Sequence, residues 1–190
     1  ILRRVTYFLS IMPLAIPGTV IGLGYILFFN QSIIGIPFTE YSLVNPLHGI
    51  YGTLWILVFV NIIHYYSVPF TTATTALKKL DKEFESVSAA MGVPFFKTLR
   101  RVTIPLCFGA ISEMIVYYFV NSMVTISAVV FLYSPKFPIA SVSIVNMEGA
   151  GNMEAAIAMG MTILYVNIIV RFLYETIMKI RMKTLARSGG

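Results

Sequence analysis

Residues 155–177 read AAIAMGMTILYVNIIVRFLYETI, a long and mostly apolar run. A helix needs about 20 mainly apolar residues to cross the hydrocarbon core of a bilayer, so this run predicts a transmembrane helix. Three further runs qualify by the same measure, at residues 5–29, 51–73 and 107–132. The sequence therefore predicts an all-α integral membrane protein of about four transmembrane helices.

The composition of the whole chain also indicates that the protein lies in a lipid bilayer. Its 190 residues are 57% hydrophobic and 12% charged, with a mean hydropathy of +0.82. Soluble domains carry roughly 25% charged residues, so a chain of this size could not hide its apolar surface from water. The net charge of +6 does not indicate a nucleic-acid partner, because the cations are grouped in short stretches between apolar runs.

The positions of the cations predict the topology. Positively charged residues concentrate in cytoplasmic loops of membrane proteins. The cations that fall on one side of the predicted helices are Arg3, Arg4, Lys78, Lys79, Lys82, Lys97, Arg100, Arg101, Lys179, Arg181, Lys183 and Arg187. Lys136 alone falls in a loop on the other side. With an even number of helices, both ends of the chain and the loop at 77–105 are expected to be cytoplasmic.

The beginning of the chain does not resemble a signal peptide. Arg3 and Arg4 precede an apolar run that is too long, contains Pro13 and Pro17, and lacks a small-residue cleavage site. We expect residues 1–190 to form a single transmembrane domain, and to be a fragment whose earlier helices are absent.

Small residues within two runs predict close packing. Gly18 and Gly22 are four residues apart, so they share a helix face on which a neighbour can approach closely. Ala156 and Gly160 repeat this spacing in the last run. Prolines 13 and 17 remove backbone donors and are expected to bend the first helix.

Residues 77–109, LKKLDKEFESVSAAMGVPFFKTLRRVTIPLCFG, form the longest polar loop. Phe84, Val87 and Met91 recur at helical spacing, with charges on the other side. An exposed apolar stripe of this kind either lies on the bilayer interface or docks into a groove on another protein. The pattern leaves both possibilities open.

Capping residues divide this loop into two helices. Asp81 is suited to cap the first helix, and Gly92 is suited to end it. Pro94 is suited to open the second, and Pro105 marks the start of the following transmembrane run.

The spacing of the loop resembles that of type I ABC importer permeases. Their cytoplasmic EAA loop has Glu-Ala-Ala, three residues, Gly, nine residues and Ile-x-Leu-Pro. Here Gly92 is followed by nine residues and then by Val102, Thr103, Ile104 and Pro105. The Glu-Ala-Ala positions hold Ser86, Val87 and Ser88 instead, with Glu85 one residue early. Residues 13–18, PLAIPG, are also similar to permeases of this class.

The resemblance implies a partial permease core with a cytoplasmic coupling helix-turn-helix at 77–105. Such a loop is seated in a groove of an ATPase subunit, which alone uses ATP, so the chain itself has no catalytic residue, bound cofactor or metal. The residues that the resemblance assigns to coupling are Asp81, Glu85, Ser86, Ser88, Gly92, Val102, Ile104 and Pro105. Glu85 and Ser86 are joint candidates for the polar contact.

The resemblance also implies the partners and the location. These are an ABC ATPase, a second permease half that is identical or different, an extracytoplasmic substrate-binding protein and the lipid bilayer. The chain is expected to be a multi-pass protein of the bacterial plasma (inner) membrane.

The segment at 119–151, FVNSMVTISAVVFLYSPKFPIASVSIVNMEGAG, resembles permeases for 2-aminoethylphosphonate. Permeases for ferric iron or polyamines are the alternatives. Polar side chains deep in a span face other helices or a watery path, and the residues concerned are Asn121, Ser122, Thr125 and Ser127. They either line the substrate pathway or make hydrogen bonds between helices.

Two other function classes fit the sequence less well. An ion-coupled transporter predicts acids or half-helices near the membrane midplane, for which Glu113 and His64, the latter toward the cytoplasmic end of its run, are the nearest candidates. Each could relay protons or serve packing. An intramembrane enzyme needs a metal set or a nucleophile with its base, and two His with one Cys supply neither.

Overall fold

The computed structural model describes residues 2–35 and 42–188, with the backbone alone at Lys82, Glu85 and 184–188. In chain order its elements are α1 (Leu2–Ala15), α2 (Gly18–Phe29), β1 (Ile33–Gly35), β2 (Ser42–Val44), η1 (His48–Ile50), α3 (Leu54–His64), α4 (Ser67–Lys79), α5 (Lys82–Ala90), α6 (Phe95–Thr98), η2 (Leu99–Thr103), α7 (Ile104–Leu106), α8 (Phe108–Val124), α9 (Ala140–Gly149) and α10 (Met153–Ser188). The protein is mostly helical, as predicted.

The four predicted spans correspond to one unbroken helix and three bent pairs. Among the described residues, only α10 is long and apolar enough to cross a membrane alone, over Met153–Lys183. Three bent pairs also qualify if each is counted as one span. They are α1 with α2, bent by 103°, α3 with α4, bent by 54°, and the segment from α6 to α7 with α8, bent by 73°. Length and composition therefore allow up to four spans.

The first bend lies at Pro17, which confirms the predicted bend of this run. Pro17 has an extended ψ of 137°, and its carbonyl accepts from the amides of Val20 and Ile21 at 3.0 and 3.2 Å. The kink is therefore where α1 ends and α2 begins.

The second bend lies between α3 and α4. The amide of Tyr66 donates to the carbonyl of Ile63 at 3.3 Å instead of to that of Ile62. The hydroxyl of Tyr118, from α8, donates to the freed Ile62 carbonyl at 3.3 Å. A side chain of a neighbouring helix thus replaces the lost helical bond.

The prediction that the third span reaches residue 132 is wrong. Helix α8 ends at Val124, because Thr125 is extended with a ψ of 136°. The Ser141 hydroxyl donates to the Thr125 carbonyl at 2.6 Å, and both residues are buried. Residues 125–139 run irregularly, and Ala128, Val129 and Leu132 enter the core instead of facing lipid.

The core lies where this irregular segment meets α2, α3 and α9. Its buried residues are Phe29, Ile56, Leu57, Val60, Ala128, Val129, Leu132 and Val142. Irregular backbone at membrane depth is tolerated when protein covers it, and this core supplies that cover.

The other connecting segments also contain more structure than predicted. Strands β1 and β2 pair antiparallel, with Ile33 opposite Val44, so the all-α prediction is wrong for this segment, whose β-branched residues favour a strand. Helix α9 occupies part of the predicted loop at 134–153, and α10 continues past the predicted limit of 177 to Ser188.

The two pairs of small residues differ in how closely their neighbours pack. Gly18 and Gly22 are buried against the irregular segment, and a Cβ on Gly22 would lie 2.6 Å from the Ala128 carbonyl oxygen. The close approach predicted for these glycines is confirmed. In α10, Ala156 is buried. No atom of the described residues would lie within 4 Å of a Cβ on Gly160, so no neighbour in that part of the chain approaches Gly160 closely.

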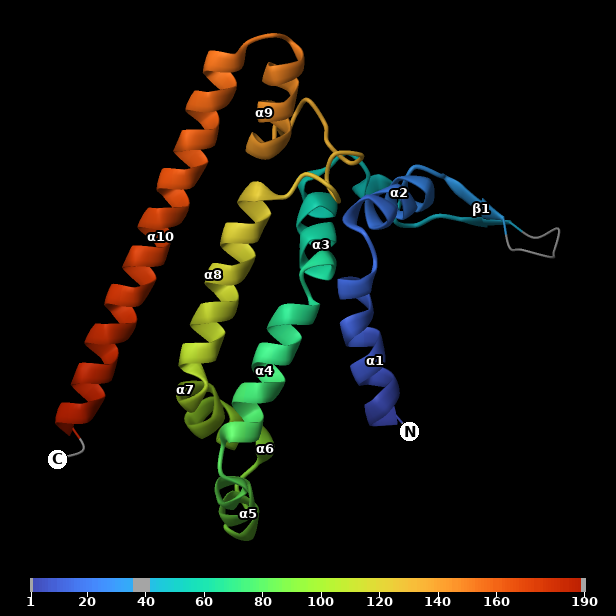
Figure 1. Ribbon diagram of the computed structural model, residues 1–190. Helices are drawn as coiled ribbons and strands as arrows, with labels where there is room; N and C mark the ends of the chain where they lie inside the picture. The colour runs from blue at the N-terminus through green and yellow to red at the C-terminus, as the bar shows by residue number, and fades with distance from the viewer. Residues whose placement is uncertain (1, 36–41, 189–190) are drawn as a thin grey trace.

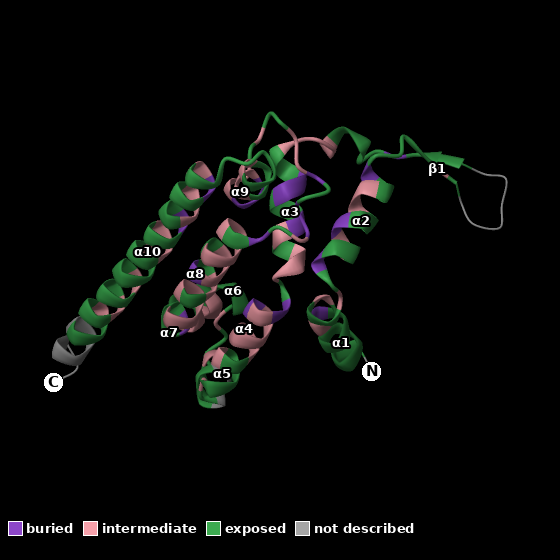
Figure 2. Ribbon diagram, turned by 45° about the horizontal axis from the view of Figure 1, so that its top comes forward, coloured by how far each residue is buried: buried purple, intermediate pink, exposed green. Residues whose placement is uncertain are grey.

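The two ends of the molecule differ (Figure 1). Both chain ends and the α5–α6 loop lie at one end, whereas α9 and the β1–β2 hairpin lie at the other. The buried residues gather around α3 and its neighbours, while α10 is mainly exposed (Figure 2). The coupling-loop candidate is therefore at the same end as both termini, as an even number of spans requires.

Gly22→Ala tests the close approach. The added methyl would meet the Ala128 carbonyl, so we expect the free energy of unfolding to fall by about 1–3 kcal/mol. Gly24→Ala in the same helix is the control, because open space surrounds that position. Thermal unfolding of the purified full-length protein in detergent measures both, and equal midpoints for the two variants would contradict the packing described here.

Candidate functional site

The α5–α6 loop is closed by local capping. The Asp81 carboxylate accepts from the Glu83 amide at 3.0 Å, which confirms the predicted cap of α5. Gly92 follows the helix with a φ of +65°, and its amide donates to the Ala89 carbonyl at 3.0 Å. Glycine adopts this left-handed conformation without steric cost, so Gly92 is the turn residue, as predicted.

A contact between side chains fastens the two helices. The hydroxyls of Ser88 in α5 and Thr98 in α6 are hydrogen-bonded. Pro94 precedes α6 with a ψ of 140°, as its predicted role at the helix start requires. Thr98 was not identified from the sequence, because nothing in the local pattern relates positions ten residues apart across a turn.

The apolar stripe of α5 has no cover within the described chain. The side chains of Phe84, Val87 and Met91 are 52%, 57% and 74% exposed. They border a groove of about 520 Å³ that Val93 and Val102 also line. Two acids, Asp81 and Glu83, and two bases, Lys97 and Arg101, belong to the same lining. An apolar strip flanked by both charge signs is suited to a protein partner.

The second half of the loop leads into α8 through a π-helical turn. In η2 the Ile104 amide donates to the Leu99 carbonyl, five residues back. Ile104 is exposed, Val102 is half-buried, and Pro105 lies within α7. The bend of 73° comes at buried Cys107, two residues after the predicted mark at Pro105.

The remaining loop candidates occupy the surface of α5. Ser86 is exposed, and its hydroxyl donates to the Glu83 carbonyl at 3.0 Å. Glu85 lies in α5, but its side chain is outside what the structure describes.

Helix α10 is tied to α8 just beyond the bend. The Arg181 guanidinium lies 3.6 Å from the centre of the Phe108 ring, a favourable cation–π arrangement. A Cβ on Gly109 would lie 3.3 Å from the Met178 methyl group. The end of α10 is thus packed against the start of α8.

The four pathway candidates do not share one surface. The Asn121 amide donates to the Tyr117 carbonyl at 2.8 Å and faces a groove between α8 and α10. Ser122 lines a separate groove toward α3. Thr125 is buried where α8 ends, and Ser127 adjoins Gly18. Their spacing of four would place Asn121 and Thr125 on one face of a continuous helix, but Thr125 lies beyond the end of α8 and the two do not share a face.

His64 lies at the bend between α3 and α4 and not toward the end of its span. Its Cε1 atom would be 2.9 Å from a Cβ on Gly18, and its ring is 4.6 Å from that of Tyr65. The Nδ1 atom is buried without a hydrogen-bond partner in the described chain. The bends of two spans and the polar Ser127 therefore meet around Gly18.

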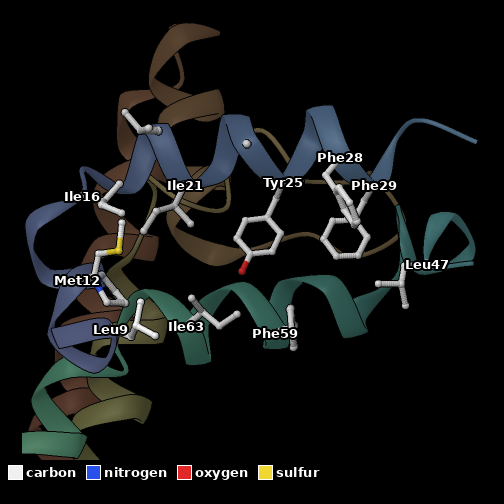
Figure 3. Close-up of a pocket in the computed structure, with 13 residues that line it drawn as sticks. Leu9, Met12, Ile16, Ile21, Tyr25, Phe28, Phe29, Leu47, Phe59 and Ile63 are labelled. Carbon is white, nitrogen blue, oxygen red and sulfur yellow. The ribbon is translucent and has the colours of Figure 1, made fainter. Parts of the chain in front are cut away.

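A pocket of about 580 Å³ opens between α1, α2 and α3 (Figure 3). Ten labelled side chains converge on it: Leu9, Met12, Ile16, Ile21, Tyr25, Phe28, Phe29, Leu47, Phe59 and Ile63. Of these, Tyr25 alone carries a polar group, so the pocket is suited to apolar groups and not to a charged solute.

Comparison with known proteins identifies relatives over most of the chain. Residues 1–179 match a family described as binding-protein-dependent transport system inner membrane component. Ferric transport system permease protein FbpB of Actinobacillus pleuropneumoniae is 28% identical over 92% of this chain and 23% of its own length. PhnV of Salmonella typhi, named as a 2-aminoethylphosphonate transport system permease protein, is 25% identical over 88% and 59%. The chain thus spans less than two thirds of either relative.

Asp81→Ala tests the cap of α5. Loss of the carboxylate leaves helix amides unpaired, which costs about 1 kcal/mol, so we expect amide exchange in α5 to accelerate by about fivefold. Asp81→Asn keeps a side-chain acceptor and serves as the control. Hydrogen exchange by mass spectrometry on the full-length protein measures this, and equal rates in the two variants would show that Asp81 does not cap the helix.

Proposed function

The chain belongs to the family of binding-protein-dependent transport system inner membrane components, and we propose that it is a permease part of an ATP-driven importer whose ATPase is a separate subunit. The observation that carries this proposal is the α5–α6 loop. Its apolar stripe is exposed at the end of the molecule opposite the β1–β2 hairpin. The chain contributes transport and coupling, and catalysis belongs to the partner.

The position of α5 favours a protein groove over the bilayer interface. In Figure 1, α5 lies beyond the ends of α4 and α8. A helix bound at the interface would lie level with the ends of the spans, whereas α5 projects past Lys78 and Lys79, the basic end of α4. A helix presented in this way is suited to helix-in-groove docking, and the ATPase subunit is the partner that we propose.

The connection from loop to spans supports a coupling role. The Ser88–Thr98 contact makes α5 and α6 move together. From α6 the chain is helical through η2 and α7 to the bend at Cys107, where α8 begins. A pull on the loop is thereby transmitted to α8. Gly92, Val102, Ile104 and Pro105 shape this connection, and Glu85 or Ser86 makes the polar contact with the ATPase.

The cations support the orientation. The loop and both chain ends carry nearly all of the basic residues, so we place that end in the cytoplasm of a bacterium. The hairpin end then faces an extracytoplasmic substrate-binding protein. A second permease half, identical or different, completes the pathway.

We propose 2-aminoethylphosphonate as the substrate, with ferric iron as the second candidate. The likeness to PhnV supports the first, and the likeness to FbpB supports the second. Of the polar residues in or after α8, Ser127 is best placed to meet the solute, because it lies beside His64 and Gly18 where the bends meet. Asn121, Ser122 and Thr125 are secondary candidates.

Cysteine crosslinking tests the coupling loop. In the assembled transporter without native cysteines, Phe84→Cys and Met91→Cys are expected to crosslink to the ATPase subunit, because both side chains are exposed. Val44→Cys, 80% exposed at the opposite end, is the matched control. Absence of crosslinks at both loop positions would exclude docking by this stripe.

Gly92→Pro tests transmission through the same loop. Proline cannot adopt the φ of +65° and lacks the amide that bonds Ala89, so we expect substrate-stimulated ATP hydrolysis to fall by about tenfold or more, a loss of roughly 1.4 kcal/mol of coupling. Gly92→Asn, which tolerates a left-handed backbone, should retain most of it. Full stimulation in an assembled Gly92→Pro complex would contradict the proposed role.

Transport by the complete complex in proteoliposomes distinguishes the substrates. With the cognate binding protein present, we expect uptake of labelled 2-aminoethylphosphonate that excess unlabelled phosphonate abolishes and ferric iron does not. Uptake of iron alone would transfer the assignment to the ferric branch, and uptake of a polyamine alone would overturn both.

A further inference from the structure

A second apolar groove lies at the hairpin end, between α3 and α8. It has a volume of about 740 Å³. The side chains that line it include Leu54, Val58 and Ile62 along α3, and Phe119 and Met123 along α8. Residues 136–140 close it at the end toward α9. None of its lining residues belongs to the α5–α6 loop.

The length of the groove matches one leaflet of a bilayer. From Leu54 to Ile62 a helix rises by about 12 Å at 1.5 Å per residue. The hydrocarbon of one leaflet is about 15 Å thick, half of the roughly 30 Å core. A transmembrane helix of a partner would extend well beyond a groove of this length, so a single acyl chain matches the groove more closely.

Two residues near the outer end of the groove are of types that favour the level of lipid headgroups. Trp55, next to Leu54 at the start of α3, is 74% exposed, and tryptophan is enriched at membrane–water interfaces. Lys136 lines the groove and is exposed. It is the only lysine or arginine in residues 30–53 and 125–152, and no acidic group in the described ranges forms an ion pair with it.

We propose that this groove binds an anionic phospholipid of the leaflet at the hairpin end. The ammonium group of Lys136 holds the phosphate, and one acyl chain lies along Leu54, Val58 and Ile62. A cation at headgroup level above an apolar channel one leaflet long has the charge and shape of such a lipid. The proposal requires that the chain spans the membrane, but it is independent of the coupling loop. Ser122, a secondary candidate for the substrate pathway, also lines this groove, so a bound lipid would keep that hydroxyl away from the solute.

Retention of lipid by the purified complex tests the proposal. The assembled transporter is reconstituted with equal phosphatidylglycerol and phosphatidylcholine, extracted, and examined by native mass spectrometry. We expect the wild type to retain phosphatidylglycerol in preference to phosphatidylcholine. Lys136→Gln should lower that retention by about fivefold, the factor typical of one basic residue near an anionic surface, and Lys136→Arg should preserve it.

Variants on the groove wall separate this site from general lipid contact. Val58→Trp fills the groove and should abolish retention of phosphatidylglycerol. Ile115→Trp, on an exposed face of α8 outside the groove, should leave it unchanged. Equal retention in Lys136→Gln and wild type, or no preference for phosphatidylglycerol in wild type, would overturn the proposal. A photocrosslink from position 58 to another protein subunit would also overturn it.

Discussion

A backbone carbonyl at membrane depth has no water to pair with, and this constraint governs the whole structure. At three interruptions of helices a side chain from elsewhere in the chain donates to a carbonyl left without its helical bond. Tyr118 serves the carbonyl of Ile62, and Ser141 serves that of Thr125. At the end of α2, the Asn45 amide donates to the carbonyls of Phe28 and Gln31, both at 2.9 Å. The bends are therefore stable features, because the bonds that they sacrifice are replaced.

Local signals were sufficient for the two helices of the α5–α6 loop, whereas contacts distant in sequence decided where α8 ends. Asp81, Gly92 and Pro94 act on their own neighbours, so the sequence predicted both helices of the loop. Residues 128–132 are as apolar as a helix interior, and no pattern within them indicates that the chain leaves the helix at Thr125. That outcome depends on Ser141 and on the glycine face of α2, which are distant in sequence. The pathway candidates lie on different surfaces for the same reason. The direction in which a residue faces can be predicted from helical spacing only if that residue lies within the helix.

Three exposed apolar surfaces of the chain differ in their position and in the charges beside them. The stripe at Phe84, Val87 and Met91 projects beyond the spans. The pocket between α1, α2 and α3 is apolar and broad, while the groove beside Lys136 is short and has one charge at its mouth. The three surfaces therefore differ in length, polarity and position, although all three are rich in apolar side chains.

Helix α10 is continuous, whereas each of the other three candidate spans is broken. Each bent pair consists of two shorter helical segments that meet at a break. Helix α10, with 36 residues and a rise of about 54 Å, has no such break. One end contacts α9, and the other rests on Phe108 through Arg181. Through this one uninterrupted helix, the start of α8 is connected to α9 at the opposite end of the molecule.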